Sequence, residues 1–169
     1  MKWRQMEDHE VEALLPTLSR LGGLRDVDAA ACRFEDIGLP FYHFGNLIRV
    51  TVPDNHDFVW YVRLEDESIT RLDGHEHSVH ACNDRAPLTL TDELINPYVR
   101  FMCYFSGLGK VFELRVKRSA VGYTGKVWIF EDDGFFEHDV NVTVRGVLVT
   151  LERTPVADVP QFFDASFSL

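Results

Sequence analysis

The stretch LTLTDELINPYVRFMCYFSGLGKVFELRVKR, residues 88–118, contains the two patterns that decide the fold class. In its first half, apolar residues recur at helical spacing from Leu94 to Phe105. Two glycines follow, and from Lys110 the chain alternates apolar and polar residues as a strand does. The stretch therefore predicts a helix over 89–107 that is followed directly by a strand.

A proline interrupts each of the two helical segments of the chain. In the second segment, Thr91 can cap the helix, and Asn96–Pro97 either begins the true helix or marks a kink in it. The first segment, residues 6–21, has one apolar stripe and four acidic residues near its start, which suits the positive end of a helix dipole. Pro16 predicts a kink there, or two short helices.

Much of the remaining chain has the alternation or the β-branched and aromatic content of strands. Residues 41–53 predict one strand, and residues 58–72 predict a hairpin with its turn at Asp66–Glu67. The C-terminal third predicts four or more strands, with turns at Asp133–Gly134 and Arg145–Gly146.

Three segments show no clear period. Residues 26–37 favour a short helix because of the run Ala29–Cys32, and residues 74–87 are polar and predict mainly a loop. The tail from Thr154 contains two prolines and is expected to pack through its phenylalanines without a regular element.

Helices in two blocks, each followed by antiparallel hairpins, predict an α+β domain. We expect one or two helical segments packed on a curved antiparallel sheet, and residues 1–169 as a single globular domain. The order of elements is similar to that of cystatin-like and NTF2-like folds.

Composition limits the classes of function. The chain is 46% hydrophobic and includes 13 Phe, which is enough to build a core, and its net charge of −10 disfavours binding to nucleic acid or to anionic membranes. Three separated cysteines suit a reducing compartment, and neither a signal peptide nor a membrane span is predicted. We therefore expect a cytoplasmic protein. The basic residues from Lys110 to Lys126 are interpreted as a solvated strand face.

Histidines gather in the stretch GHEHSVHAC, residues 74–82. Imidazole is a good ligand for zinc and other transition metals. On an extended strand His75 and His77 would point to the same side, and a loop could bring His80 towards them. Because no second His or Cys pair follows, these three residues are weak candidates for a metal site, and a polar surface loop is the preferred interpretation.

No sequence motif assigns a catalytic residue. The acidic stretch 131–139 lacks the spacing of a calcium loop, and the two Gly-Lys pairs lack the rest of a phosphate loop. Cys103 lies on the apolar face of a predicted helix, where a structural thiol is expected, so Cys82 beside His80 is the thiol to test for reactivity. The cofactor stays unknown, and the sequence favours a protein that is not an enzyme.

Aromatic residues of the predicted strands over 41–61 form most of the expected core. If these strands curve, they could also line a pocket, in which Tyr42, His43 and Tyr61 would supply the polar groups.

The segment Leu88–Val116 resembles a family of uncharacterised bacterial proteins, chiefly from proteobacteria. The resemblance lies in a threonine-capped helix with core aromatics, then a glycine turn and a strand, and it extends to the hairpin over 61–74 with His80 and Asn83. The matching positions in the segment are Tyr98, Phe101, Tyr104, Phe105, Gly107, Gly109 and Phe112. Pro97 departs from the pattern. The resemblance implies a bacterial cytoplasmic protein and no catalytic residue.

Three functions are therefore weighed. The first is a non-catalytic protein-interaction module that binds another protein or a second copy of itself, and a homodimer is the commonest form of self-association. The second is a small-molecule-binding protein or enzyme with a pocket between helix and curved sheet. The third is a metal-binding protein that uses the loop His75–His80.

Overall fold

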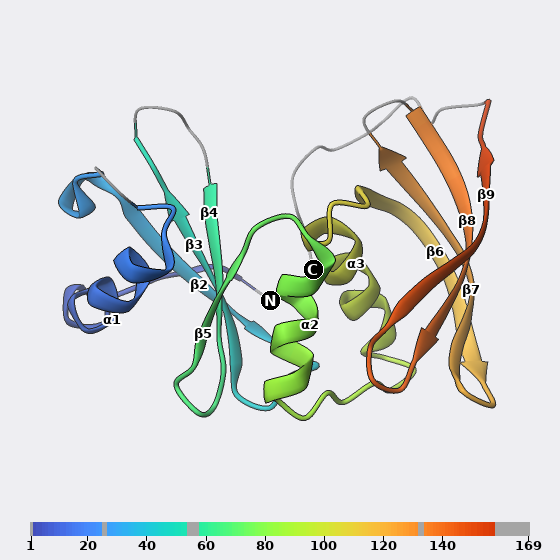
Figure 1. Ribbon diagram of the computed structural model, residues 1–169, viewed down its shortest axis with the longest axis horizontal. Coiled ribbons are helices and arrows are strands. Elements are labelled where there is room, and N and C mark those ends of the chain that lie inside the picture. The colour runs from blue at the N-terminus through green and yellow to red at the C-terminus, as the bar shows by residue number, and fades with distance from the viewer. Residues whose placement is uncertain (1, 25–26, 54–57, 132–133, 158–169) are drawn as a thin grey trace.

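The computed structural model describes residues 2–24, 27–53, 58–131 and 134–157. A helix, a sheet, a pair of helices and a second sheet follow one another along the longest axis of the molecule (Figure 1). The predicted α+β class is confirmed, and both sheets are antiparallel. The strands divide between two sheets where the sequence predicted one, and the described residues include three α-helices.

The first sheet has five strands that lie in sequence order. The hairpin predicted over 58–72 is confirmed, and Glu67 in its turn has a φ of 60°. The strand predicted over 41–53 begins later, at Gly45, and two further strands, which the sequence did not predict, precede it. The five strands are β1 (Arg4–Gln5), β2 (Arg33–Leu39), β3 (Gly45–Thr51), β4 (Phe58–Arg63) and β5 (Ile69–Leu72).

One face of the first sheet is covered by α1 (Asp8–Leu21) (Figure 1). Of the two alternatives that Pro16 predicted, two short helices is wrong, because α1 is a single helix that includes Pro16. Pro16 is exposed, so the carbonyl group that loses its partner can be solvated. The short helix expected within 26–37 is a single 3₁₀ turn, η1 (Ala29–Ala31), in which the Ala30 N–H donates to Asp28 Oδ1 at the N-cap.

The other face of the first sheet packs against α2 (Glu76–Arg85), which replaces the loop predicted over 74–87. Its apolar face is short, since only Ser78, Val79 and Cys82 are buried. The sequence of α2 has only a weak helical period, so packing between the two sheets provides most of the stability of this helix.

Beside it lies α3 (Ile95–Phe105), within the segment where a helix was predicted. The Thr91 hydroxyl accepts a hydrogen bond from the Leu94 N–H at 3.3 Å in the turn that precedes the helix. The N-cap of α3 itself is Leu94, so Thr91, the predicted cap, lies three residues before the observed cap position. Pro97 lies in the first turn, where a backbone N–H has no intrahelical partner, so it does not interrupt the helix.

The second sheet covers the opposite side of α3 (Figure 1). Its four strands also lie in sequence order, and the predicted turn at Arg145–Gly146 is confirmed. The prediction that the tail lacks a regular element from Thr154 is wrong at its start, because Thr154 and Pro155 belong to the last strand. The rest of the tail beyond 157, and Asp133 of the turn predicted at Asp133–Gly134, lie outside the described residues. The strands are β6 (Lys110–Ser119), β7 (Gly122–Glu131), β8 (Gly134–Thr143) and β9 (Leu148–Pro155).

The main core is shared by both sheets. It runs from Leu47 and Val62 of the first sheet, through Val99 of α3, to Val127 and Val140 of the second sheet. A separate cluster fills the space between α1 and the outer face of the first sheet. Because α2 and α3 lie between two apolar sheet faces, burial of both helices depends on both sheets.

A buried chain of hydrogen bonds crosses this middle layer. The Tyr42 hydroxyl donates to Asn83 Oδ1 at 2.5 Å, and Asn83 Nδ2 donates to the Tyr98 hydroxyl at 2.8 Å. The Tyr98 hydroxyl in turn donates to the Gly146 carbonyl at 2.5 Å. The chain links the turn after β2, both central helices and the β8–β9 turn, and it satisfies polar groups that would be costly to bury alone.

Candidate functional site

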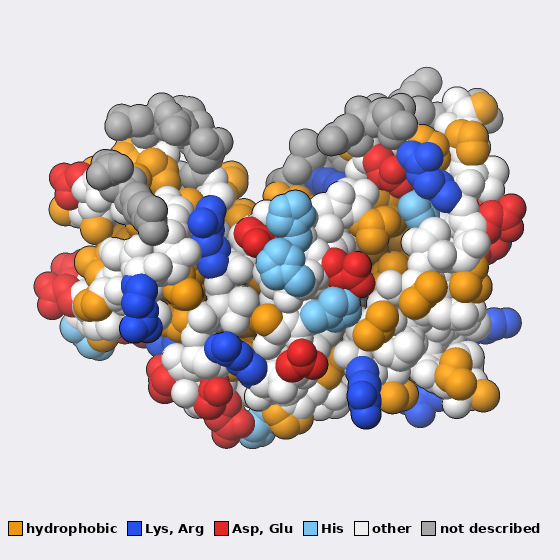
Figure 2. Space-filling model, viewed as in Figure 1, with side chains coloured by type: hydrophobic (Ala, Val, Ile, Leu, Met, Phe, Trp, Pro, Cys, Tyr) orange, Lys and Arg blue, Asp and Glu red, His pale blue; other side chains and the backbone are white. Residues whose placement is uncertain are grey.

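The three histidines proposed as metal ligands lie at the start of α2 and do not converge. The His75 and His77 rings stack with centroids 5.8 Å apart, and His77 Nε2 lies 3.2 Å from Asp73 Oδ2. His80 Nε2 instead contacts Glu76 Oε1 at 2.8 Å. Figure 2 shows histidine and acidic side chains interspersed over the face where α2 lies. Across the described ranges, no three His, Cys, Asp or Glu side chains gather as metal ligands do.

The thiols also differ from expectation. Cys82 is fully buried, and burial raises its pKa to about 11, so the structure does not support a reactive Cys82. Cys103 is buried as predicted, with a pKa raised by burial to about 12. Cys32, which the sequence did not single out, is the one partly exposed thiol.

The polar groups expected in an aromatic pocket point to different places. Tyr42 faces α2, whereas the Tyr61 hydroxyl donates to the Gly22 carbonyl on the α1 side of the sheet at 2.7 Å. His43 is exposed, 3.9 Å from Glu65. Tyr42, His43 and Tyr61 therefore do not form one site.

The basic stretch is largely paired with acidic groups. Arg115 contacts Glu113 at 2.7 Å, and Lys126 bonds Glu137 and lies 3.7 Å from Asp139. These pairs support the interpretation of the stretch as a solvated strand face. Arg118, by contrast, reaches away to a loop and contributes to a pocket described below.

His138 lies buried on β8 between an acid and a hydroxyl. Its Nε2 contacts Glu131 Oε1 at 2.5 Å, and its Nδ1 lies 3.4 Å from Thr150 Oγ1. Arg153 Nη2 also binds Glu131 at 2.7 Å, and these contacts lower the pKa of Glu131 despite its partial burial. The acid, imidazole and hydroxyl follow the order of a catalytic relay. The long contact to Thr150 and the paired carboxylate fit an ion-pair network equally well.

A groove of about 400 Å³ runs between α1, η1 and the β1–β2 edge. Its apolar side chains come from α1 and the adjoining strand, and Asp8 and Glu12, one helical turn apart, supply its acidic groups. Cys32 and two alanines complete the wall opposite the helix. The apolar side chains are Met6, Val11, Leu15 and Phe34.

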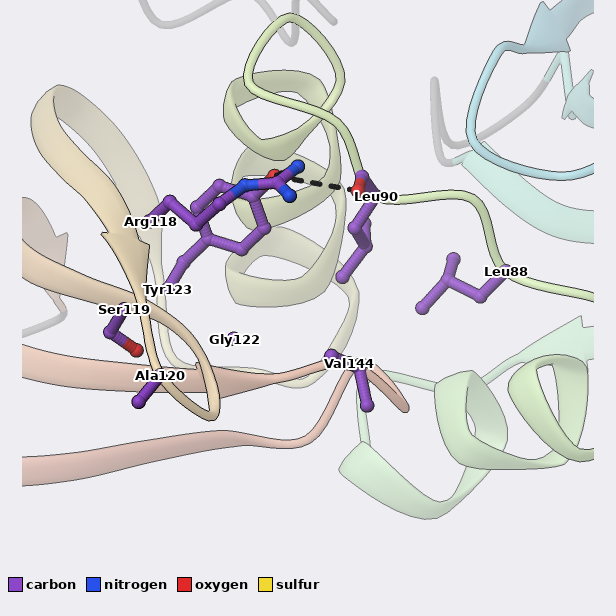
Figure 3. A pocket seen from close by; sticks show the side chains of 8 residues that line it. All are labelled: Leu88, Leu90, Arg118, Ser119, Ala120, Gly122, Tyr123 and Val144. Atoms are coloured by element: carbon purple, nitrogen blue, oxygen red, sulfur yellow. Dashed lines mark hydrogen bonds between the residues drawn. The ribbon is translucent and has the colours of Figure 1, made fainter.

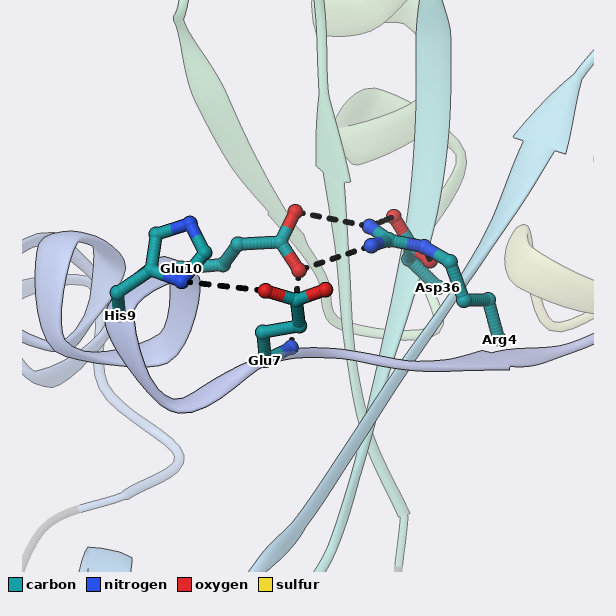
Figure 4. Close-up of polar contacts among 5 residues, drawn as sticks. All are labelled: Arg4, Glu7, His9, Glu10 and Asp36. Carbon is teal, nitrogen blue, oxygen red and sulfur yellow. Dashed lines mark hydrogen bonds and ion pairs between the residues drawn. The ribbon is translucent and has the colours of Figure 1, made fainter.

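Arg4 holds the helix of this groove against the sheet (Figure 4). Its guanidinium donates to both Asp36 oxygens on β2 at 2.8 and 2.9 Å, and to both Glu10 oxygens on α1 at 2.9 and 3.0 Å. The bonds from Arg4 and from the Glu7 N–H lower the pKa of Glu10 to about 2. Arg4 is thereby occupied and does not neutralise Asp8 or Glu12.

A second hollow, of about 320 Å³, lies between the β6–β7 turn, the β8–β9 turn and the loop before α3 (Figure 3). Arg118, Ser119 and Tyr123 of the β6–β7 hairpin lie on one side of it, and apolar side chains lie across from them. Arg118 Nε bonds Asp92 at 3.2 Å and its Nη2 bonds the Tyr123 hydroxyl at 3.2 Å. The apolar side chains are Leu88, Leu90 and Val144.

Neither hollow was predicted from the sequence. The acidic start of the first helix was noted, but only as a complement to the helix dipole. Arg118 was read as one charge of a solvated strand. A cation at the end of a strand, directly before a turn, is a signal that could have marked it for closer attention.

Comparison of the chain with protein-family models, with curated proteins and with solved structures finds no match. The resemblance of Leu88–Val116 to a bacterial family therefore stays a prediction. None of the described helices has the length and apolar character needed to cross a membrane.

Proposed function

We propose that this protein is a non-catalytic interaction module, and that the groove beside α1 binds a basic, amphipathic segment of another protein. The observation that carries the proposal is the combination of an apolar lining with Asp8 and Glu12 in the same groove. An apolar groove edged by charge is how proteins commonly receive an amphipathic segment.

The lining offers apolar surface to such a segment. Met6 and Phe34 are almost fully buried, whereas Val11 and Leu15 are only half-buried and remain partly accessible in the groove. Burial of this remaining apolar surface by a partner would supply the affinity.

The charges favour a basic partner. Asp8 and Glu12 are exposed and have no recorded ion pair within the described ranges, because the nearby Arg4 is held by Glu10 and Asp36. The net charge of −10 adds a long-range field of the same sign. Such a field speeds association with a cationic partner and repels an acidic one.

The groove is also held in shape before any partner arrives. Four hydrogen bonds from Arg4 fix the first turn of α1 to β2, so little conformational entropy is lost there on binding.

The test is a titration of the intact chain with a labelled amphipathic peptide of leucine and lysine, compared with a matched peptide of leucine and glutamate. We expect only the lysine peptide to bind, with an affinity that falls as salt is added. The double variant Asp8→Asn, Glu12→Gln should weaken binding about tenfold. The control, Glu93→Gln with Glu152→Gln, makes the same change of charge elsewhere and should bind normally.

Two further readouts locate the peptide. Ala30→Trp places a bulky side chain in the groove from an exposed position and should abolish binding, and bound peptide should slow labelling of Cys32 by a maleimide. Equal binding of both peptides, or binding that Ala30→Trp leaves unchanged, would overturn the proposal. A concentration-dependent dimer that Ala30→Trp abolishes would also overturn it, because the occupant would then be a second copy.

A further inference from the structure

We propose that the pocket between the β6–β7 turn, the β8–β9 turn and the loop before α3 binds a small apolar molecule that ends in a single carboxylate. This site is separate from the groove beside α1 and shares no lining residue with it. The proposal rests on three features: the unused N–H donors of Arg118, the Ser119 hydroxyl, which has no partner among the described residues, and an apolar lining of limited volume.

Arg118 is held in one orientation and still has donors available. Its Nε–H is directed to Asp92 and one Nη2–H to the Tyr123 hydroxyl, and its cationic carbon lies 5.6 Å from the Tyr123 ring centre. A guanidinium has five N–H donors, so three remain, on Nη1 and Nη2. These adjacent nitrogens form the edge that binds the two oxygens of a carboxylate.

Ser119 supplies a second polar group. Its Oγ is buried and has no hydrogen-bond partner among the residues that the structure describes. A buried hydroxyl without a partner is unfavourable, so the position favours a ligand atom that accepts its hydrogen bond. Ser119 lines the same pocket as Arg118 (Figure 3).

The rest of the lining sets the size and the apolar character of the ligand. Leu88, Leu90 and Val144 face the polar side of the pocket (Figure 3). A volume of about 320 Å³ holds about ten non-hydrogen atoms at the ~30 Å³ that each water molecule occupies in the liquid. A carboxylate with a phenyl ring or a short branched chain matches this volume.

The local charge favours one negative charge over two. Asp92 already offsets part of the Arg118 charge, and the chain as a whole is strongly acidic. A dianionic phosphate would meet this repulsion, whereas a carboxylate adds only a single charge.

The experiment is isothermal titration of the intact chain with 3-phenylpropionate, its primary amide and phenylphosphonate. We expect the carboxylate to bind best. Arg118→Gln should weaken its binding about tenfold or more, because charge-assisted hydrogen bonds are lost. The matched control is Arg115→Gln on the same strand, whose guanidinium is paired with Glu113 and lies over Trp128 outside the pocket.

The variant Ser119→Ala distinguishes a loss of ligand affinity from a loss of stability. Because its Oγ has no partner among the described residues, the variant should be as stable as the parent chain or more so, and yet bind the carboxylate several-fold more weakly. Val144→Trp, at a largely exposed position, should fill the pocket and abolish binding.

Three results would overturn the proposal. They are no binding of the carboxylate, equal binding of the amide, or binding that survives both Arg118→Gln and Val144→Trp. The Asp8→Asn, Glu12→Gln variant should bind the carboxylate normally, so failure of this proposal is distinguishable from failure of the proposed function.

Discussion

Gly146 lies in the turn between β8 and β9, where its carbonyl accepts the last hydrogen bond of the Tyr42–Asn83–Tyr98 chain. Its φ of 77° is one that L side chains rarely adopt. A Cβ here would also meet the Tyr98 hydroxyl, and would lie 2.6 Å from Leu88 Cδ2 and 2.8 Å from Asn83 Nδ2. Conformation and close packing therefore both require glycine at this position.

Comparison with Gly74 separates the effect of backbone conformation from the effect of close packing. Its φ is 82°, close to that of Gly146, but a Cβ there would meet nothing within 4 Å. Gly74→Ala should cost about 1 kcal/mol in free energy of unfolding from backbone strain. Gly146→Ala should cost at least about 2 kcal/mol more, because the buried network must shift. Urea unfolding of both variants measures the difference in their free energies of unfolding. Equal losses would show that the hydrogen-bond chain can rearrange around the added methyl group without a penalty.

At the scale of elements, hydrophobic periodicity predicted the helices and strands that have a clear period of their own. It missed elements that are stabilised mainly by contacts with residues distant in sequence. Residues 26–37 favour a short helix because of the run Ala29–Cys32, yet residues 33–39 form the strand β2, which includes Glu35 and Asp36. Both carboxylates are buried in β2, where Arg49 and Arg33 bind Glu35 and Arg4 binds Asp36. Arg49 and Arg4 are distant from β2 in sequence, so local periodicity does not predict the strand.

The attachment of α1 to β2 should depend on pH through Glu10. Its pKa is lowered to about 2 from an ordinary value of 4.5, so the charged form contributes stability above about pH 4.5. This contribution should be lost as the pH falls towards 2. Because Arg4 is half exposed, Glu10→Gln should cost only about 0.5 to 1 kcal/mol at pH 6.

The measurement is the free energy of unfolding in urea for the parent chain and Glu10→Gln, at pH 6 and at pH 2. The difference between them should shrink towards zero at the lower pH. Glu12→Gln on the same helix, which breaks no ion pair recorded in the described ranges, should change stability little at either pH. A difference for Glu10→Gln that persists at pH 2 would contradict the role assigned to its charge.

At the scale of the whole molecule, the shared core predicts that the two sheets unfold together. Val62 in the first sheet and Val127 in the second are both fully buried, and both belong to one continuous cluster. Val62→Ala and Val127→Ala should each cost about 2 kcal/mol and should each lower the same single transition.

Thermal unfolding followed by far-ultraviolet circular dichroism and by tryptophan fluorescence tests this cooperativity. Trp3 and Trp60 report on the first sheet, and Trp128 reports on the second. Two separate transitions, one of which responds only to Val127→Ala, would show that the sheets fold independently.

The sequence by itself determined the α+β class, the helices around residues 8–21 and 95–105, the hairpin over 58–72 and the strands of the C-terminal third. These predictions were possible because apolar residues recur in each segment at the spacing of a helix or a strand, and this spacing reflects the face that is buried. The acidic net charge also follows from composition alone.

Only the tertiary structure decided that residues 76–85 are helical, that the strands form two sheets, and where the groove and the pocket lie. The helix α2 depends on sheet faces that pack on its few buried residues. The groove needs α1 held against β2 by Arg4, with η1 on its other side. Arg118 becomes part of a pocket only because the chain brings Asp92 and Val144 beside its strand. Such contacts between distant residues leave no periodic trace in the sequence, so the fold class was predictable and the candidate sites were not.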